Sequence, residues 1–266
     1  MLEATGGLER IVIAMLSQHG LAVMRINPKR IRDFAKAHGL FAKTDALDAY
    51  AIALFGARMR PERRPVIEPE RQHLGVWVAR QRQLTAQRAI ERTRLKQCED
   101  AQIRESIERL IAFLGEELQR IEQHIADWIE NSPMWSGQEK QLRSAPGVGP
   151  KTARVLLAQM PELGRLNRRE AASLAGLAPY ASESGLWRGK RQIRGGRSMV
   201  RAALYLASWS AIRVQGRLRD FYRRLVDSGK PKQVALIAVA RKLLLALNEM
   251  LRTGQWWKDE RNPTQA

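Results

Sequence analysis

The chain has 266 residues, and 44% of them are hydrophobic, so it is long enough to bury a core and too apolar for an intrinsically disordered protein. Its 46 Lys and Arg against 27 Asp and Glu give a net charge of +19. This charge is typical of proteins that bind polyanions, most often DNA or RNA, although a basic soluble surface or docking on anionic lipid also explains it. The single Cys98 excludes an internal disulfide and a cysteine-cluster zinc site. We expect a cytoplasmic protein with no membrane contact, because we find no secretory signal and no apolar run that could cross a bilayer.

Residues 1–60 form the first predicted domain, in which helix and strand alternate. A glycine pair precedes an apolar-periodic helix over 8–18, and the short apolar run 21–26 predicts a buried strand. Helices are expected from Asn27-Pro28 to His38 and from about 44 to 59. The strand–helix–strand order predicts part of an α/β layer with a parallel pair.

Residues 61–139 form the second predicted segment, a linker followed by long helix. Three prolines lie among charges in 60–70, whereas 71–131 contain no proline and predict long helix. Their second half carries a seam typical of a coiled coil with one stutter, made by Ile103, Ile107, Leu110, Leu114, Leu118, Ile121, Ile125 and Trp128. Residues 71–100 contain seven basic and three acidic residues, whereas residues 101–131 contain three basic and seven acidic residues. This contrast suits an antiparallel hairpin or pairing between subunits, and two solvated faces would explain it equally well.

Residues 140–254 form the third predicted domain, and 255–266 are a tail. The domain holds 23 basic and 6 acidic residues, so almost all of the net charge lies there. The pattern predicts helices over 151–160, 168–176, 197–213, 216–228 and 232–252. The expected fold class is therefore mainly α with a partial α/β N-terminal domain.

The segment from Leu142 to Ala153 resembles a helix-hairpin-helix motif, with a Pro-Gly-Val-Gly turn between two helices. Gly147 and Gly149 would let the backbone approach a phosphate, next to the positive end of the following helix and the charge of Lys151. Such a turn binds the nucleic-acid backbone without reading sequence. An ordinary tight helix–helix turn is the alternative.

A glycine-punctuated, very basic loop spans 180–197. Ser184, with Ser182 as the alternative, offers a hydroxyl that could attack phosphorus if cations stabilise the developing charge. By itself a Ser-Gly pair in a loop usually indicates only a turn. The cations that could surround a phosphodiester are Arg188, Lys190, Arg191, Arg194 and Arg197.

Carboxylates in the first domain provide a candidate metal site. Asp45 and Asp48 are three residues apart at a helix start and share one face, where they could hold a divalent cation. Acidic residues in a first turn also simply complement the helix dipole. Glu3 lies at a strand end before a glycine turn, a position where α/β sheets place functional groups. Taken by itself, this position does not indicate a particular function.

Taken in order, these elements resemble one family over nearly the whole chain. They are similar to insertion-sequence transposases that pair a RuvC-like Asp-Glu-Asp-Asp domain with a C-terminal serine domain, a family that includes bridge-RNA-guided recombinases and Piv-type DNA invertases. The matching pieces are Glu3-Ala-Thr-Gly-Gly, Lys43-Thr-Asp-Ala-Leu-Asp-Ala, Pro146-Gly-Val-Gly-Pro-Lys-Thr-Ala, Ala175-Gly-Leu-Ala-Pro, Ser184-Gly, Ser228-Gly-Lys-Pro-Lys and Val239-Ala-Arg-Lys-Leu.

The resemblance implies a role for each piece. Glu3, Asp45 and Asp48 would hold Mg²⁺ together with a further aspartate, and Ser184 would attack phosphorus to give a covalent DNA–serine intermediate. The neighbouring arginines would neutralise the phosphate. The partners implied are DNA (transposon ends and target), a guide RNA in the bridge-RNA branch, and further copies of the chain joined through the long helices. Such a protein would be associated with the nucleoid.

One departure concerns the first aspartate of the family, which lies on a strand before the Glu-Ala-Thr-Gly-Gly motif. This chain begins at that motif. We therefore expect an N-terminally truncated transposase, and a longer reading frame that supplies an Asp at the end of a hydrophobic strand. A non-catalytic DNA- or RNA-binding helical protein is the competing hypothesis.

Overall fold

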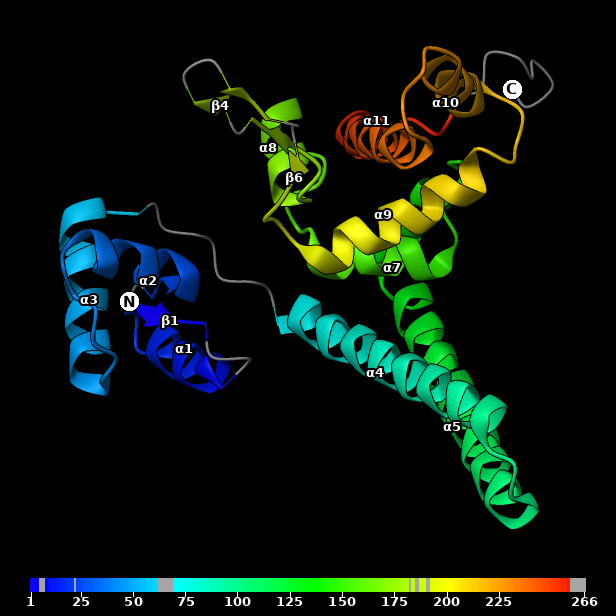
Figure 1. Ribbon diagram of the computed structural model, residues 1–266, viewed down its shortest axis with the longest axis horizontal. Helices are drawn as coiled ribbons and strands as arrows, with labels where there is room; N and C mark the ends of the chain where they lie inside the picture. The colour runs from blue at the N-terminus through cyan, green and yellow to red at the C-terminus, as the bar shows by residue number, and fades with distance from the viewer. Residues whose placement is uncertain are drawn as a thin grey trace. The chain divides into compact units, whose positions relative to one another are not determined.

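The computed structural model describes residues 1–4, 8–21, 23–61, 69–181, 183–184, 187–189 and 192–258. The chain divides into two compact units, Met1–Val66 and Ile67–Ala266, and each is described by itself. Helices dominate both (Figure 1), which confirms the mainly α class. None of the described helices is long and apolar enough to cross a membrane.

The elements follow the chain in this order. The first unit holds β1 (Leu2–Glu3), α1 (Glu9–Gln18), β2 (Arg25–Ile26), α2 (Pro28–Ala37) and α3 (Asp45–Met59). The second holds α4 (Pro69–Gln97), α5 (Ala101–Glu130), α6 (Pro133–Arg143), α7 (Pro150–Gln159), α8 (Arg168–Leu174), β3 (Pro179–Tyr180), β4 (Glu183–Ser184), β5 (Trp187–Arg188), β6 (Gln192–Ile193), α9 (Ser198–Ala211), α10 (Arg217–Asp227) and α11 (Lys232–Thr253).

The first unit is a parallel strand pair covered by two helices. β1 pairs with β2 in parallel, as the strand–helix–strand pattern predicts, and among the described residues of the strand expected over 21–26 only Arg25–Ile26 form it. The side chain of Asn27 caps α2 and that of Thr44 caps α3, each accepting a backbone N–H. A small core gathers Ile26, Ile31, Ala35, Ala51 and Phe55. One face of α1 stays exposed: Leu8, Ile11 and Met15 are 78%, 70% and 57% accessible.

Helices α4 and α5 form an antiparallel hairpin, so the hairpin alternative is the one found within a single chain (Figure 1). The Asp100 side chain caps α5 by accepting from the Ile103 N–H, which ends the long helix predicted over 71–131 and starts a new one. The coiled-coil seam is buried from Leu114 to Ile125, and Trp128 at its end is partly buried. Ile103 and Leu110, nearer the hairpin tip, are 55% and 43% exposed.

The C-terminal helices α6–α9 and α11 pack around the main core. The boundaries of α7–α11 lie within two residues of those predicted, because the apolar periodicity and the glycine stops are local signals. Trp135, Leu142, Leu243 and Leu244 are fully buried there. The predicted border between the second and third domains, at 139/140, falls inside α6, which packs on both α5 and α7.

The basic loop contains paired strands rather than turns alone. β3 pairs antiparallel with β6. Between them in the chain, β4 pairs antiparallel with β5. Residues with high strand propensity, such as Tyr180, Trp187 and Ile193, occupy these strands between the glycines. We call this double pair the basic ribbon (179–193).

Candidate nucleic-acid interface

The turn between α6 and α7 is where the sequence predicts phosphate binding, and its two glycines have different surroundings. Gly147 has φ +78°, and a Cβ there would lie 2.1 Å from the Ala207 carbonyl oxygen and 2.6 Å from the Ala211 N. Gly147 is therefore required by close packing of the turn on α9. Gly149 has nothing within 4 Å of the same position and caps α7 with its backbone. Only Gly149 leaves room for a ligand on its Cβ side.

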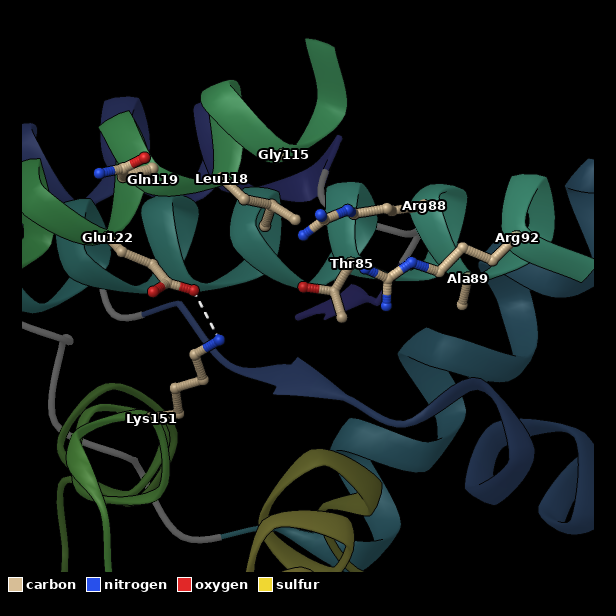
Figure 2. Close-up of a pocket in the computed structure, with 9 residues that line it drawn as sticks. All are labelled: Thr85, Arg88, Ala89, Arg92, Gly115, Leu118, Gln119, Glu122 and Lys151. Atoms are coloured by element: carbon tan, nitrogen blue, oxygen red, sulfur yellow. Dashed lines mark ion pairs between the residues drawn. The ribbon is translucent and has the colours of Figure 1, made fainter. Parts of the chain in front are cut away.

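The first turn of α7 carries the positive charge expected there. The helix begins at Pro150, which leaves its first backbone N–H groups without intrahelical acceptors. Lys151 Nζ lies 2.6 Å from Glu122 Oε1 on α5 (Figure 2). Partial burial is the largest single influence and raises the pKa of Glu122, but the hydrogen bond from Lys151 and the charges of Lys151 and Arg154 outweigh it, so the pKa is lowered. Glu122 therefore stays ionised and holds the Lys151 ammonium against the hairpin.

The basic ribbon has a rigid base. Gly176 and Gly196 both have positive φ, and a Cβ on Gly196 would lie 2.2 Å from the Gly176 N. The Arg197 N–H donates to the Leu174 carbonyl at 2.7 Å, and the Arg201 guanidinium donates to the Gly195 carbonyl at 2.7 Å. These contacts, which we call the glycine clamp, join both ends of the ribbon to the end of α8 and the start of α9.

Ser184 and its neighbours lie on this ribbon. In β4, Ser184 is paired with Trp187 and Glu183 with Arg188. Ser182, Lys190 and Arg191 lie outside the described residues. The Arg194 guanidinium lies 5.6 Å from the centroid of the Tyr180 ring, a cation–π contact at the ribbon base.

Among the predicted cations whose side chains the structure describes, Arg197 has extensive contacts inside the protein. Its Nη1 and Nη2 each lie 2.6 Å from one carboxylate oxygen of Glu162, and Nη1 also donates to the Gln159 carbonyl. Such a two-pronged pair fixes the guanidinium in place. Arg197 therefore anchors the start of α9 to the loop after α7.

The three predicted metal ligands all lie in the first unit. Glu3 ends β1, while Asp45 and Asp48 occupy the first turn of α3. Asp45 is exposed and Asp48 half-buried. Among the described residues no group of three or more His, Cys, Asp or Glu gathers as a metal site. The described carboxylates thus do not form a closed metal site by themselves.

Comparisons with known proteins converge on one class. Residues 139–223 match the family described as "Transposase IS116/IS110/IS902 family", and residues 1–100 match an IS110 transposase family of the DEDD type. The chain belongs to the IS110/IS116/IS902 transposase family. It is 27% identical to the "Pilin gene-inverting protein" of Moraxella lacunata and to that of Moraxella bovis, over 96% of this chain and 80% of each relative. It is also 30% identical to the "Insertion element IS110 uncharacterized 43.6 kDa protein" of Streptomyces coelicolor, over 58% of this chain and 37% of that protein.

Membership of this transposase family confirms the resemblance drawn from the motifs and implies DNA binding. DEDD transposases typically depend on a metal ion. The first family match covers the turn, the ribbon and α9, while the second covers all three predicted metal ligands and α4. The two stretches that the sequence singled out for chemistry therefore lie in family-defining regions.

Sequence reasoning missed several residues near the turn and the ribbon. Arg88 and Arg92 on α4 and Glu122 on α5 entered the sequence reasoning only through the charge counts of 71–100 and 101–131. The available signal was Gly115, the one glycine in 101–131, because a glycine inside a helix often marks a close approach. The glycine clamp had no such signal, since Gly176 and Gly196 are far apart in sequence.

Proposed function

We propose that this transposase-family chain carries out site-specific DNA strand exchange through attack of Ser184 on a DNA phosphodiester. The Ser184 Oγ would bond to phosphorus while the bond from phosphorus to one deoxyribose oxygen breaks. The serine proton would pass to a base, and the departing deoxyribose oxygen would take one up. A covalent DNA–serine ester conserves the phosphodiester energy, so a second deoxyribose hydroxyl can rejoin the strand. DNA inversion, the activity named for the Moraxella relatives, is one outcome of such exchange.

The observation that carries this proposal is the clamped basic ribbon that contains Ser184. A nucleophile needs cations near the developing phosphate charge and a fixed position. We expect the charge to come from Arg188, Lys190 and Arg191 of the ribbon and from Arg194 directly after it. Arg197 already pairs with Glu162, so it is expected to position the ribbon more than it binds phosphate.

The turn before α7 is proposed to bind the DNA backbone as a helix-hairpin-helix does. Gly149 and Lys151 supply the open approach and the charge, whereas Gly147 shapes the turn by packing on α9. Because such contacts involve phosphates, they would hold DNA without reading its sequence.

We propose that Glu3, Asp45 and Asp48 supply carboxylates for Mg²⁺ in a RuvC-like first domain. Mg²⁺ is usually held by one or two carboxylates together with phosphate oxygens, and these three residues do not gather into a complete site among the described residues. Metal binding is therefore expected to need further ligands, such as a DNA phosphate. When bound, the ion would neutralise charge on the reacting phosphate.

Further partners are proposed on the same grounds. The basic surface suits a guide RNA as well as DNA. The exposed Ile103 and Leu110 near the hairpin tip suit contact with a second copy of the chain, as the predicted coiled-coil pairing requires.

A trapping experiment tests the nucleophile. Protein is mixed with transposon-end DNA and Mg²⁺, with and without element-encoded RNA, and covalent protein–DNA adduct is measured on denaturing gels. We expect an adduct with wild type and with Ser182→Ala, and none with Ser184→Ala. An adduct that survives Ser184→Ala and disappears with Ser182→Ala would move the reaction to the other serine.

A non-catalytic DNA- or RNA-binding protein is the second candidate, and the lack of a closed carboxylate group among the described residues favours it. It predicts tight, salt-sensitive binding with no adduct under any condition. The same experiment therefore separates the two candidates.

A further inference from the structure

A groove lies along the α4–α5 hairpin beside the start of α7. It has a volume of about 400 Å³ and is lined by Thr85, Arg88, Ala89, Arg92, Gly115, Leu118, Gln119, Glu122 and Lys151. Figure 2 shows the side chains of Arg88, Arg92 and Thr85 on one helix, with Lys151 reaching toward Glu122 from α7. The groove thus joins two arginines of the hairpin to the helix start that is proposed to bind DNA.

Charge in the groove is mainly positive. The lining contains three cations, Arg88, Arg92 and Lys151. Its one carboxylate, that of Glu122, forms an ion pair with Lys151. Arg88 and Arg92 have no ion pair among the described residues. Other arginines of the hairpin do pair with carboxylates: Arg94 with Glu91 at 2.7 Å and Arg109 with Glu105 at 2.8 Å. The two unpaired guanidinium groups in one groove are therefore available to an anion.

Gly115 explains how Arg88 is held. A Cβ on Gly115 would lie 3.1 Å from Arg88 Nη2 and 3.2 Å from Arg88 Cζ, so the missing side chain leaves space for the guanidinium against α5. The Arg88 Nε is buried without a hydrogen-bond partner. Burial of Nε against α5 fixes the position of the guanidinium, so an anion in the groove would meet this charged group already oriented.

We propose that this groove binds a phosphate group of the nucleic-acid backbone. Guanidinium groups match phosphate oxygens in geometry, and the Thr85 hydroxyl is a further donor in the lining. The ionised Glu122 repels an anion at its own end, so the phosphate lies toward Arg88 and Arg92. The Lys151 ammonium lies between this phosphate and one bound at the start of α7, so the groove extends the backbone contact of the turn onto the hairpin. The inference rests on the proposed function only in taking nucleic acid as the ligand, and it does not require Ser184 chemistry.

The test compares two charge-matched double variants of the full chain. R88Q/R92Q removes the groove arginines, and R80Q/R82Q removes two exposed arginines from the same helix that do not line the groove. Binding of labelled duplex DNA, duplex RNA and single strands is measured by fluorescence anisotropy without Mg²⁺ across a salt series. We expect R88Q/R92Q to weaken binding roughly tenfold and to reduce the salt slope by about 1, the signature of one lost phosphate contact. R80Q/R82Q should weaken it less than about threefold.

A third variant, Gly115→Leu, fills the groove without changing the charge. It should also weaken binding, with circular dichroism and the melting temperature showing that the hairpin still folds. If Gly115→Leu disrupts the hairpin, the comparison of the two double variants is the test of the groove proposal. A loss on DNA, on RNA or on both supports the groove and identifies the source of the phosphate. Equal losses in the two double variants would overturn it. Absence of nucleic-acid binding by the wild-type protein would overturn the proposed function as well. Intact binding here, together with no adduct in the trapping experiment, would support the groove and overturn only the serine reaction.

Discussion

Replacing Gly147 with alanine is expected to destabilise the C-terminal unit, because its missing side chain lets the α6–α7 turn pack on α9. The added Cβ would lie 2.1 Å from the Ala207 carbonyl oxygen and 2.6 Å from the Ala211 N, so backbone must shift. Placing a Cβ at φ +78° costs about 1–2 kcal/mol, and overpacking adds about 1–3 kcal/mol. The expected loss is therefore about 2–5 kcal/mol, which lowers the melting temperature by roughly 5–15 °C for a unit of this size.

Gly149→Ala is the matched control in the same turn. Its φ is −83° and nothing lies within 4 Å of the new methyl group, so the cost should stay below about 1 kcal/mol, that of a weaker helix cap. Thermal and urea melts followed by circular dichroism measure both variants. Gly149→Ala should instead weaken DNA binding, since its methyl group points into the space that a phosphate would use. If Gly147→Ala melts no lower than Gly149→Ala, the packing argument fails.

Three further outcomes follow from the same structure. Gly196→Ala should push the basic ribbon off its clamp and reduce adduct formation by up to about 100-fold, the penalty for a nucleophile misplaced by about 1 Å, and an unchanged adduct yield would argue against the clamp. Arg154→Met removes the partner that lies 3.0 Å from the buried Glu139 carboxylate and leaves that carboxylate with Arg143 Nη1 at 4.0 Å, so urea melts should show a loss of up to about 3–5 kcal/mol that the added change Glu139→Leu largely restores. The pKa of Glu122 is lowered from 4.5 by folding, so its contact with Lys151 stabilises the fold above the unfolded pKa and is lost as pH falls through the lower folded pKa. Glu122→Gln should flatten this acid dependence in melts between pH 6 and the folded pKa, and identical slopes would contradict the assignment.

The sequence alone determined the features that depend on neighbours in the chain. Apolar spacing and glycine stops predicted the C-terminal helices to within two residues, since helix formation follows an i, i+4 pattern. The ordered motifs also identified the family before any comparison. Glu3, the Asp45–Asp48 pair and Ser184 each lie in a short contiguous motif, which can be recognised without knowing the fold.

Contacts between residues that are far apart in the sequence were decided only by the tertiary structure. The two glycines of one turn look alike in sequence, yet Gly147 packs on α9 while Gly149 faces open space. The ribbon was predicted only as a loop because its short strands pair through backbone groups. Arg88 and Lys151 are separated by more than sixty residues, and no local pattern indicates that they line one groove. Periodicity reports which face of a helix is apolar, whereas the surface that this face meets depends on how the whole chain folds.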